Sequence, residues 1–224
     1  MSYSPEKIGG VGLGLRFPHF NEILKFDHEV PWFEVMTDDF LEDGPHHRKL
    51  EILRESKPIA FHSVGLNIGG VQEFDKKYLK KFKELYEFFQ PELVTDHLCW
   101  SAHKGQYHHD LLPIPRTEEA LQHVAGRITY LQDYFGRHLA FENITIYIDF
   151  RNSEFSEIEF LKKLVKLTGC GLLLDISNVV INHKNRELDY SAYFSNFPLE
   201  SVAQIHVAGS DSSGSVIILS LIHI

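Results

Sequence analysis

Short apolar runs alternate with longer amphipathic runs along this chain. Seven of the apolar runs have the length and composition of β-strands, and each leads to a polar side chain. The runs are nearly continuous in apolar residues, as at residues 58–61 and 171–174, which is typical of parallel strands covered by helices. The polar residues at the strand ends are, in chain order, Arg16, Glu34, His62, His97, Glu142, Asp175 and His206.

Three of the amphipathic runs predict well-marked helices. Residues 75–90 place an apolar stripe on one face, with Asp75 as a plausible N-cap. Residues 117–136 begin at a capping Thr117 and end at Gly136, and the sequence SEIE at 156–159 is a capping box that begins a third helix. Weaker helical patterns lie at residues 21–25, 47–56 and 190–196.

The alternation of strands and helices, without linkers, predicts one α/β domain over residues 1–224. An open doubly wound sheet collects its functional residues at one switch point, whereas a TIM (β/α)8-type barrel uses the ends of many strands. Polar residues end all seven predicted strands. The pattern therefore favours the barrel.

Composition excludes several classes of function. The formal charge of −9 argues against a nucleic-acid binder, which would carry a basic face. The beginning of the chain has no signal-peptide pattern, and no apolar run approaches the ~18 residues of a membrane helix, so we expect a cytoplasmic protein with no membrane partner. The two cysteines, Cys99 and Cys170, lie in or beside apolar runs and suit a reducing compartment.

The polar strand ends favour a metal centre. A histidine at a strand end is often structural, but three at equivalent positions, together with three carboxylates, favour metal binding. The structural alternative for a carboxylate such as Asp175 is a buried ion pair with Arg16 or another cation. Mixed His and carboxylate ligands suit iron, manganese, zinc or cobalt better than calcium or magnesium, and no thiolate stands at a proposed ligand position.

The sequence HHDLLPIP at 108–115 predicts a turn-rich loop after the fourth strand. In a barrel this loop would lie on the side of the active site, so His109 and Asp110 are candidates for substrate contact. Exposed loop residues without a function are the alternative.

An ordered set of segments resembles a known family. The segments are GLGLR, WFEVMTDDF, FHSVGLNIGG, TDHLCWS, DLLPIP, LAFENIT, GCGLLLDISNV and QIHVAG, spread over residues 9–209. In this order and spacing they resemble the DUF692 family, a group of multinuclear non-haem iron-dependent oxidases of peptide-modifying gene clusters. Their order along the chain is far more specific than any single segment.

The resemblance implies a TIM barrel that holds two or three iron ions. It also implies oxidative modification of cysteines in a small ribosomally made precursor peptide, presented by a partner protein. Arg16 and Asn143 would position ligands or substrate, Glu34 would support substrate binding, and His183 is a weaker metal candidate. The implied metal ligands are His62, His97, Glu142, Asp175, Asn178 and His206.

The chain also departs from the family pattern. Residues 36–39 read MTDD where the family has His-Ser-Glu-Asn, and Ser177 stands where the family has Asn. After Gly209 the family continues with an Asp-x-His pair and an eighth strand bearing Glu, whereas residues 210–224 form an atypical C-terminal tail. We therefore expect a barrel that is incomplete or irregularly closed, in which the final apolar run could pair antiparallel or with another molecule.

Two other interpretations remain open. The chain could be a different divalent-metal TIM-barrel enzyme, such as a xylose-isomerase-like isomerase or endonuclease, because those enzymes also use His, Glu and Asp at strand ends. It could also be a non-catalytic relative that binds a peptide or partner protein. Metal content separates the first alternative from an iron oxidase, and oxygen consumption separates the second.

Overall fold

The computed structural model describes residues 8–25, 29–186, 189–212 and 216–220, and the side chains of His109 and Ser220 lie outside the described part. The chain forms two compact units. The N-terminal unit contains the described chain up to Leu66 together with Glu73–Asp96, and the C-terminal unit contains Asn67–Gln72 and the chain from His97 onward. The expectation of one domain over residues 1–224 stays a prediction.

The N-terminal unit carries four parallel strands in the order β1-β2-β3-β4. In register, Glu34 of β2 lies beside Ala60, and His62 of β3 lies beside Thr95. The rings of Phe61, Phe82 and Phe89 pack in its core, with Phe61 6.4 Å and 6.3 Å from the other two. The elements are β1 Leu13–Leu15, η1 Phe17–His19, α1 Phe20–Ile23, β2 Phe33–Met36, η2 Thr37–Phe40, α2 Pro45–Ser56, β3 Ile59–Ser63, α3 Lys76–Phe89 and β4 Leu93–His97.

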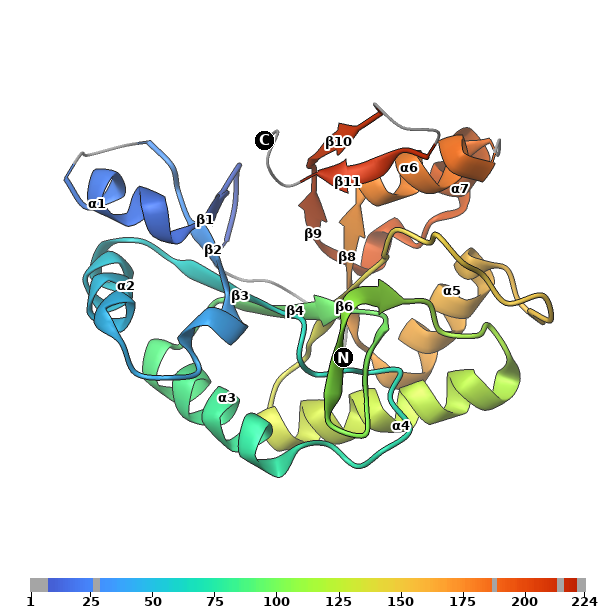
Figure 1. Ribbon diagram of the computed structural model, residues 1–224, viewed down its shortest axis with the longest axis horizontal. Helices are drawn as coiled ribbons and strands as arrows, with labels where there is room; N and C mark the ends of the chain where they lie inside the picture. Colours follow the sequence, from blue (N-terminus) through green and yellow to red (C-terminus); the bar gives the residue numbers. More distant parts are fainter. Residues whose placement is uncertain (1–7, 26–28, 187–188, 213–215, 221–224) are drawn as a thin grey trace. The chain divides into compact units, whose positions relative to one another are not determined.

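The C-terminal unit carries the parallel strands β7-β8-β9 and two antiparallel hairpins. Helices α4 and α5 lie side by side, and α6 contacts α7, β9 and the β10–β11 hairpin (Figure 1). Leu161, Leu172, Leu174 and Tyr193 form part of its core. The elements are β5 Trp100–His103, β6 Gln106–Leu112, α4 Glu118–Phe135, β7 Ala140–Glu142, α5 Glu157–Thr168, β8 Gly171–Asp175, α6 Ile176–Arg186, α7 Tyr190–Asn196, η3 Leu199–Ser201, β9 Val202–His206, β10 Gly209–Asp211 and β11 Ile218–Ser220.

The three well-marked helices are confirmed together with their capping residues. Asp75 accepts hydrogen bonds from the first turn of α3, and Thr117 accepts one from the first turn of α4. The capping box at Ser156 and Glu159 begins α5, and Gly169 ends it in the left-handed region at φ 66°. Among the described residues, no helix is both long and apolar enough to cross a membrane.

Helix α6 is not among the helices predicted from the sequence. Its residues include β-branched and Asn side chains of low helix propensity. The helix begins directly at the end of β8, where a carboxylate oxygen of Asp175 accepts a hydrogen bond of 2.7 Å from Asn178 N. Asp175 therefore caps the first turn, and packing against α7 and β9 overrides the weak propensity.

The predicted loop at residues 108–115 is also partly wrong. Residues 106–112 form strand β6, which pairs antiparallel with β5 across a turn at Lys104 and Gly105. Both turn residues have positive φ, at 49° and 76°. This geometry suits a two-residue hairpin turn and explains how a polar sequence continues as a strand.

The C-terminal tail adopts one of the arrangements considered from its sequence. Strand β11 pairs antiparallel with β10, from Gly209 opposite Ser220 to Asp211 opposite Ile218. The side chain of Asn185 on α6 bonds both backbone groups of Ile217, each at 2.8 Å. The hairpin is therefore fixed to α6 rather than added to the parallel strands.

Arg127 on α4 holds the segment Asn67–Gln72 in the C-terminal unit. Its guanidinium donates to the carbonyls of Ile68, Gln72 and Asn67 at 3.0, 2.7 and 3.1 Å. Burial lowers the pKa of Arg127 to about 10, which still leaves it charged at neutral pH. One side chain thus satisfies three carbonyls of an irregular segment.

We expect Arg127→Met to lower the free energy of unfolding by about 3 kcal/mol, because three partly buried carbonyls lose a charged donor. Urea unfolding followed by circular dichroism measures the change. Arg48→Met, which removes an exposed guanidinium paired with Glu51, is the control and should leave the free energy of unfolding nearly unchanged. Equal losses in the two variants would contradict the role given to Arg127.

Candidate metal centre

Four candidate ligands of the C-terminal unit stand at strand ends, and His97 is the only residue of β4 that belongs to this unit. His97, Glu142, Asp175 and His206 are the last residues of β4, β7, β8 and β9. Parallel strands place their carboxyl ends at the same edge, and Asp175 is in register with His206. The backbone N–H of Leu98 also donates to the carbonyl of Glu142 at 2.9 Å, which fixes the end of β4 beside the end of β7.

Glu142 lies between two imidazoles. Its Oε2 is 3.3 Å from His97 Nε2, and its Oε1 is 3.6 Å from His206 Nδ1. The carboxylate is buried, and the two histidines are mostly buried. Two nitrogen ligands and one carboxylate therefore converge within the C-terminal unit, a donor set that suits iron and other divalent transition metals.

Asp175 adds a second carboxyl group to this cluster. Burial, together with the nearby charge of Glu142, raises the pKa of Asp175 to about 7. Two adjacent buried carboxylates repel each other, so a proton or a cation must compensate one of the charges. A bound divalent cation would compensate the charge while both carboxyl groups stay deprotonated.

Asn178 and Asn143 hold the carboxylates in place. The amide nitrogen of Asn178 donates to Asn143 O at 2.8 Å and to Glu142 Oε1 at 3.4 Å, while its amide oxygen accepts from the Thr145 hydroxyl. Asn143 bonds both backbone groups of Asp175, at 3.0 and 2.9 Å. In this arrangement the two amides act as positioning groups for Glu142 and Asp175.

Gln204 is a neighbour of the cluster that the sequence did not reveal. Its amide nitrogen lies 3.0 Å from His206 Nε2. This contact orients the imidazole so that Nδ1 faces Glu142. The available signal was the i,i+2 spacing, which puts Gln204 and His206 on one face of β9.

Three predicted site residues belong to the N-terminal unit. His62 is buried near the end of β3, and its Nδ1 lies 2.7 Å from the Thr95 hydroxyl. Arg16 follows β1, as expected. Glu34 is buried but is the second residue of β2, so its expected place at the strand end is wrong. The apolar run continues past Glu34 through Val35 and Met36, which extends the strand.

The two candidate substrate contacts are on β6 rather than in a loop. Asp110 is exposed, and its carboxylate accepts a hydrogen bond of 2.8 Å from the N–H of Leu111. The side chain of His109 lies outside the described residues. The role of both residues in substrate binding stays a prediction.

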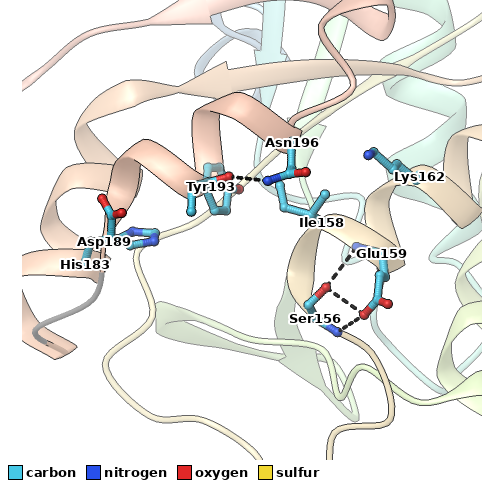
Figure 2. A pocket seen from close by; sticks show the side chains of 9 residues that line it. Ser156, Ile158, Glu159, Lys162, His183, Asp189, Tyr193 and Asn196 are labelled. Carbon is cyan, nitrogen blue, oxygen red and sulfur yellow. Dashed lines mark hydrogen bonds between the residues drawn. The ribbon is translucent and has the colours of Figure 1, made fainter.

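A large cavity of the C-terminal unit lies elsewhere, between α5, α6 and α7 (Figure 2). Its volume is about 610 Å³, and His183 and Tyr193 line it with Ser156 and Lys162. His183 Nδ1 lies 2.8 Å from the carbonyl of Val179 one turn earlier in α6. None of the four clustered strand-end residues lines this cavity, so volume alone does not locate the candidate metal centre.

Comparison with known families gives one match over almost the whole chain. The family model described as "RiPP precursor modification enzyme MbnB/TglH/ChrH" matches residues 10–220. A UPF0276 protein of Anaeromyxobacter sp. (strain Fw109-5) is 40% identical over 206 residues, which are 92% of this chain and 73% of the relative. A UPF0276 protein of Paraburkholderia phytofirmans is 40% identical over 200 residues, covering 89% of this chain and 65% of that protein.

Solved structures with the same fold are distant in sequence. A D-psicose 3-epimerase crystallised with D-fructose has a TM-score of 0.56 at 11% identity, over 92% of this chain and 77% of its own. Endonuclease IV from Thermus thermophilus has a TM-score of 0.53 at 17% identity, over 89% of this chain and 78% of its own. These similarities confirm the α/β, TIM-barrel-type fold, and at such identities they show the fold alone.

We expect Asp175→Asn to stabilise the metal-free protein more at pH 8 than at pH 5. The pKa of Asp175 is raised from 3.8 to about 7 in the folded protein, so ionisation of Asp175 lowers the free energy of unfolding. This loss of stability is absent below pH 3.8 and grows as the pH rises to about 7. Asparagine keeps an acceptor for Asn178 N and cannot ionise.

Thermal unfolding in the presence of a chelator measures this difference. Asp110→Asn, the same substitution at an exposed carboxylate, serves as the control. A gain from Asp175→Asn that is equal at the two pH values would rule out the raised pKa.

Proposed function

Because this chain belongs to the RiPP precursor modification enzyme family MbnB/TglH/ChrH, we propose that it is a metal-dependent oxidase that modifies a cysteine of a small ribosomally made peptide. Family membership supports the peptide substrate. The oxidative chemistry, the iron and a protein that presents the peptide are further parts of the proposal. The observation that carries it is the position of the Glu142 carboxylate between His97 and His206.

The donor set fits iron. Two histidines and one carboxylate with open positions are typical of non-haem iron oxygenases. The two cysteines are buried, and burial raises the pKa of Cys170 to about 11, so neither is suited to act as a competing thiolate ligand. When bound, iron supplies one-electron redox chemistry and Lewis acidity toward a substrate thiol.

The residues around the cluster have separate tasks in this proposal. Asn143 and Asn178 orient Asp175 and Glu142, so that the carboxylates need not rearrange when a cation binds. Gln204 orients the ring of His206. In the metal-free protein Asp175 holds a proton near neutral pH, and a cation would displace that proton because it favours the carboxylate.

The remaining assignments rest on the sequence resemblance. We include His62 and Asn178 among the metal ligands, and two or three iron ions as the complement. Arg16, Glu34, His109 and Asp110 are assigned to positioning or substrate contact on the same basis.

The first experiment is metal analysis of protein purified without oxygen. We expect about two to three iron ions per chain in the parent protein. Glu142→Gln and His97→Ala should each lower iron affinity at least about tenfold, because each removes one converging ligand atom. His108→Ala, at an exposed position of β6, is the matched control.

Bound zinc or manganese without iron would favour an isomerase- or endonuclease-like metal enzyme instead. Unchanged iron content in both ligand variants would refute the assignment of Glu142 and His97.

The second experiment follows oxygen consumption and peptide mass with a cysteine-containing peptide. We expect both signals with the cysteine peptide and neither with its serine counterpart, since the proposed reaction begins at a thiol. Iron binding without oxygen consumption, across a panel of cysteine peptides, would favour a non-catalytic peptide-binding relative.

A further inference from the structure

The segment that follows β7 divides into a buried half and an exposed half. Residues 143–146 are buried directly after Glu142, whereas residues 147–152 are all exposed. We call residues 143–146 the inner half and residues 147–150 the outer half of the β7 loop. The inner half continues directly from the candidate metal ligand Glu142, so the outer half lies a short distance along the chain from the metal centre.

Helix α6 holds the inner half. Asn182 donates to the carbonyl of Ile144 at 2.9 Å and accepts from the N–H of Ile146 at 2.6 Å. Asn178, one turn earlier, donates to the carbonyl of Asn143 and accepts from Thr145. Residues four apart lie on one face of a helix. The side-chain amides of Asn178 and Asn182 therefore both face the inner half and make hydrogen bonds with its backbone, as the backbone of a neighbouring strand does in a sheet.

Two arginines hold the outer half. The carboxylate of Asp149 accepts from Arg116 at 2.8 Å and from Arg186 at 3.0 Å. Partial burial raises the pKa of Asp149, but the two guanidiniums lower it by more. The pKa is therefore below its ordinary value, and the carboxylate stays charged. The Tyr147 hydroxyl accepts from the N–H of Leu219 on β11 at 3.2 Å.

This fixed segment presents large apolar side chains to solvent. Tyr147 is 41% exposed, Ile148 63% and Phe150 43%, and Ile218 beside Leu219 is also exposed. Scattered exposed apolar residues are ordinary, but three within four residues on a segment held at both sides form a patch. A held patch binds with a lower entropic cost than a flexible one.

The charge beside the patch is positive. Arg116 and Arg186 share the carboxylate of Asp149. Both also interact with the carboxyl group of Glu157, whose pKa is raised by burial, so the exposed positive charge beside the patch is that of Arg151. Arg151 is exposed and makes no ion pair with any residue that the structure describes. The nearby Glu154 is bonded to the N–H of Glu118. In a chain with a formal charge of −9, this local sign favours an acidic partner group.

We propose that the outer half of the β7 loop is a docking surface for a segment of the substrate peptide that combines large apolar residues with an acidic residue. The proposal rests on the proposed function for its peptide substrate. Ile148 is six residues after Glu142, so their Cα atoms are within about 20 Å of each other. About six extended residues therefore suffice to connect the docked segment to the cysteine that is modified.

Peptide binding tests the proposal independently of turnover. The probes are four fluorescein-labelled 12-residue peptides with one cysteine, whose neighbouring segment is apolar and acidic, apolar and basic, polar and acidic, or polar and basic. Fluorescence anisotropy with the full chain, without oxygen and with reductant, measures each Kd. We expect the apolar acidic peptide to bind at least about tenfold more tightly than the other three.

Variants locate the binding. The double substitution Ile148→Ser and Phe150→Ser should weaken the apolar acidic peptide at least about tenfold, and Arg151→Glu should shift the preference to the apolar basic peptide. Leu167→Ser, at a residue of α5 that is 50% exposed in the same unit, is the matched control and should bind like the parent. If Arg151 had only a structural role, Arg151→Glu would not change which peptide is preferred.

Equal binding of all four peptides, or parent-like binding by the double variant and Arg151→Glu, would overturn the proposal. A mass measurement of each peptide after exposure to oxygen is independent of these results. Selective binding without any cysteine modification would refute the proposed function and leave the docking surface supported. Modification with no peptide preference would support the function and refute the docking surface.

Discussion

The amide side chain of Asn178 connects the parts of the C-terminal unit on which the candidate chemistry depends. Its two amide hydrogens serve Glu142 and the carbonyl of Asn143, and its oxygen accepts from Thr145. Its backbone N–H donates to the carboxylate of Asp175, which caps the first turn of α6. One residue therefore fixes a carboxylate of β7, a carboxylate of β8 and the segment that leaves β7. Buried amides of this kind are costly unless every hydrogen bond is made.

The proximity of two buried carboxylates has a direct electrostatic consequence. Glu142 and Asp175 disfavour each other's charge, and the imidazole of His206 offsets this only in part. A site with this imbalance favours a cation or a proton. Electrostatic repulsion of this kind would destabilise an ordinary core, but it is common in metal centres, where a bound cation compensates the negative charge.

The β7 loop connects the candidate metal ligands to the surface of the same unit. Its first residues are paired with Asn178 and Asn182, and its next residues are fixed through Asp149 by Arg116 and Arg186. Glu142 and the exposed Ile148 are thus parts of one ordered segment. A peptide that contacts the outer half would be held near the reacting group without a movement of the loop, which is the physical basis of preorganised binding.

The sequence by itself determined the alternation of strands and helices, the caps at Asp75, Thr117 and Ser156, and the strand ends at His97, Glu142, Asp175 and His206. These features depend on local periodicity and capping, which are readable along the chain. Only the tertiary structure decided helix α6, the β5–β6 hairpin and the roles of Asn182 and Gln204. The residues of these elements have weak preferences for one secondary structure. Their conformations depend instead on contacts with residues distant in sequence or with the preceding strand. The short distances of Glu142 from His97 and His206 likewise arise only when β4, β7 and β9 end at one edge, because no local pattern measures the distance between strands.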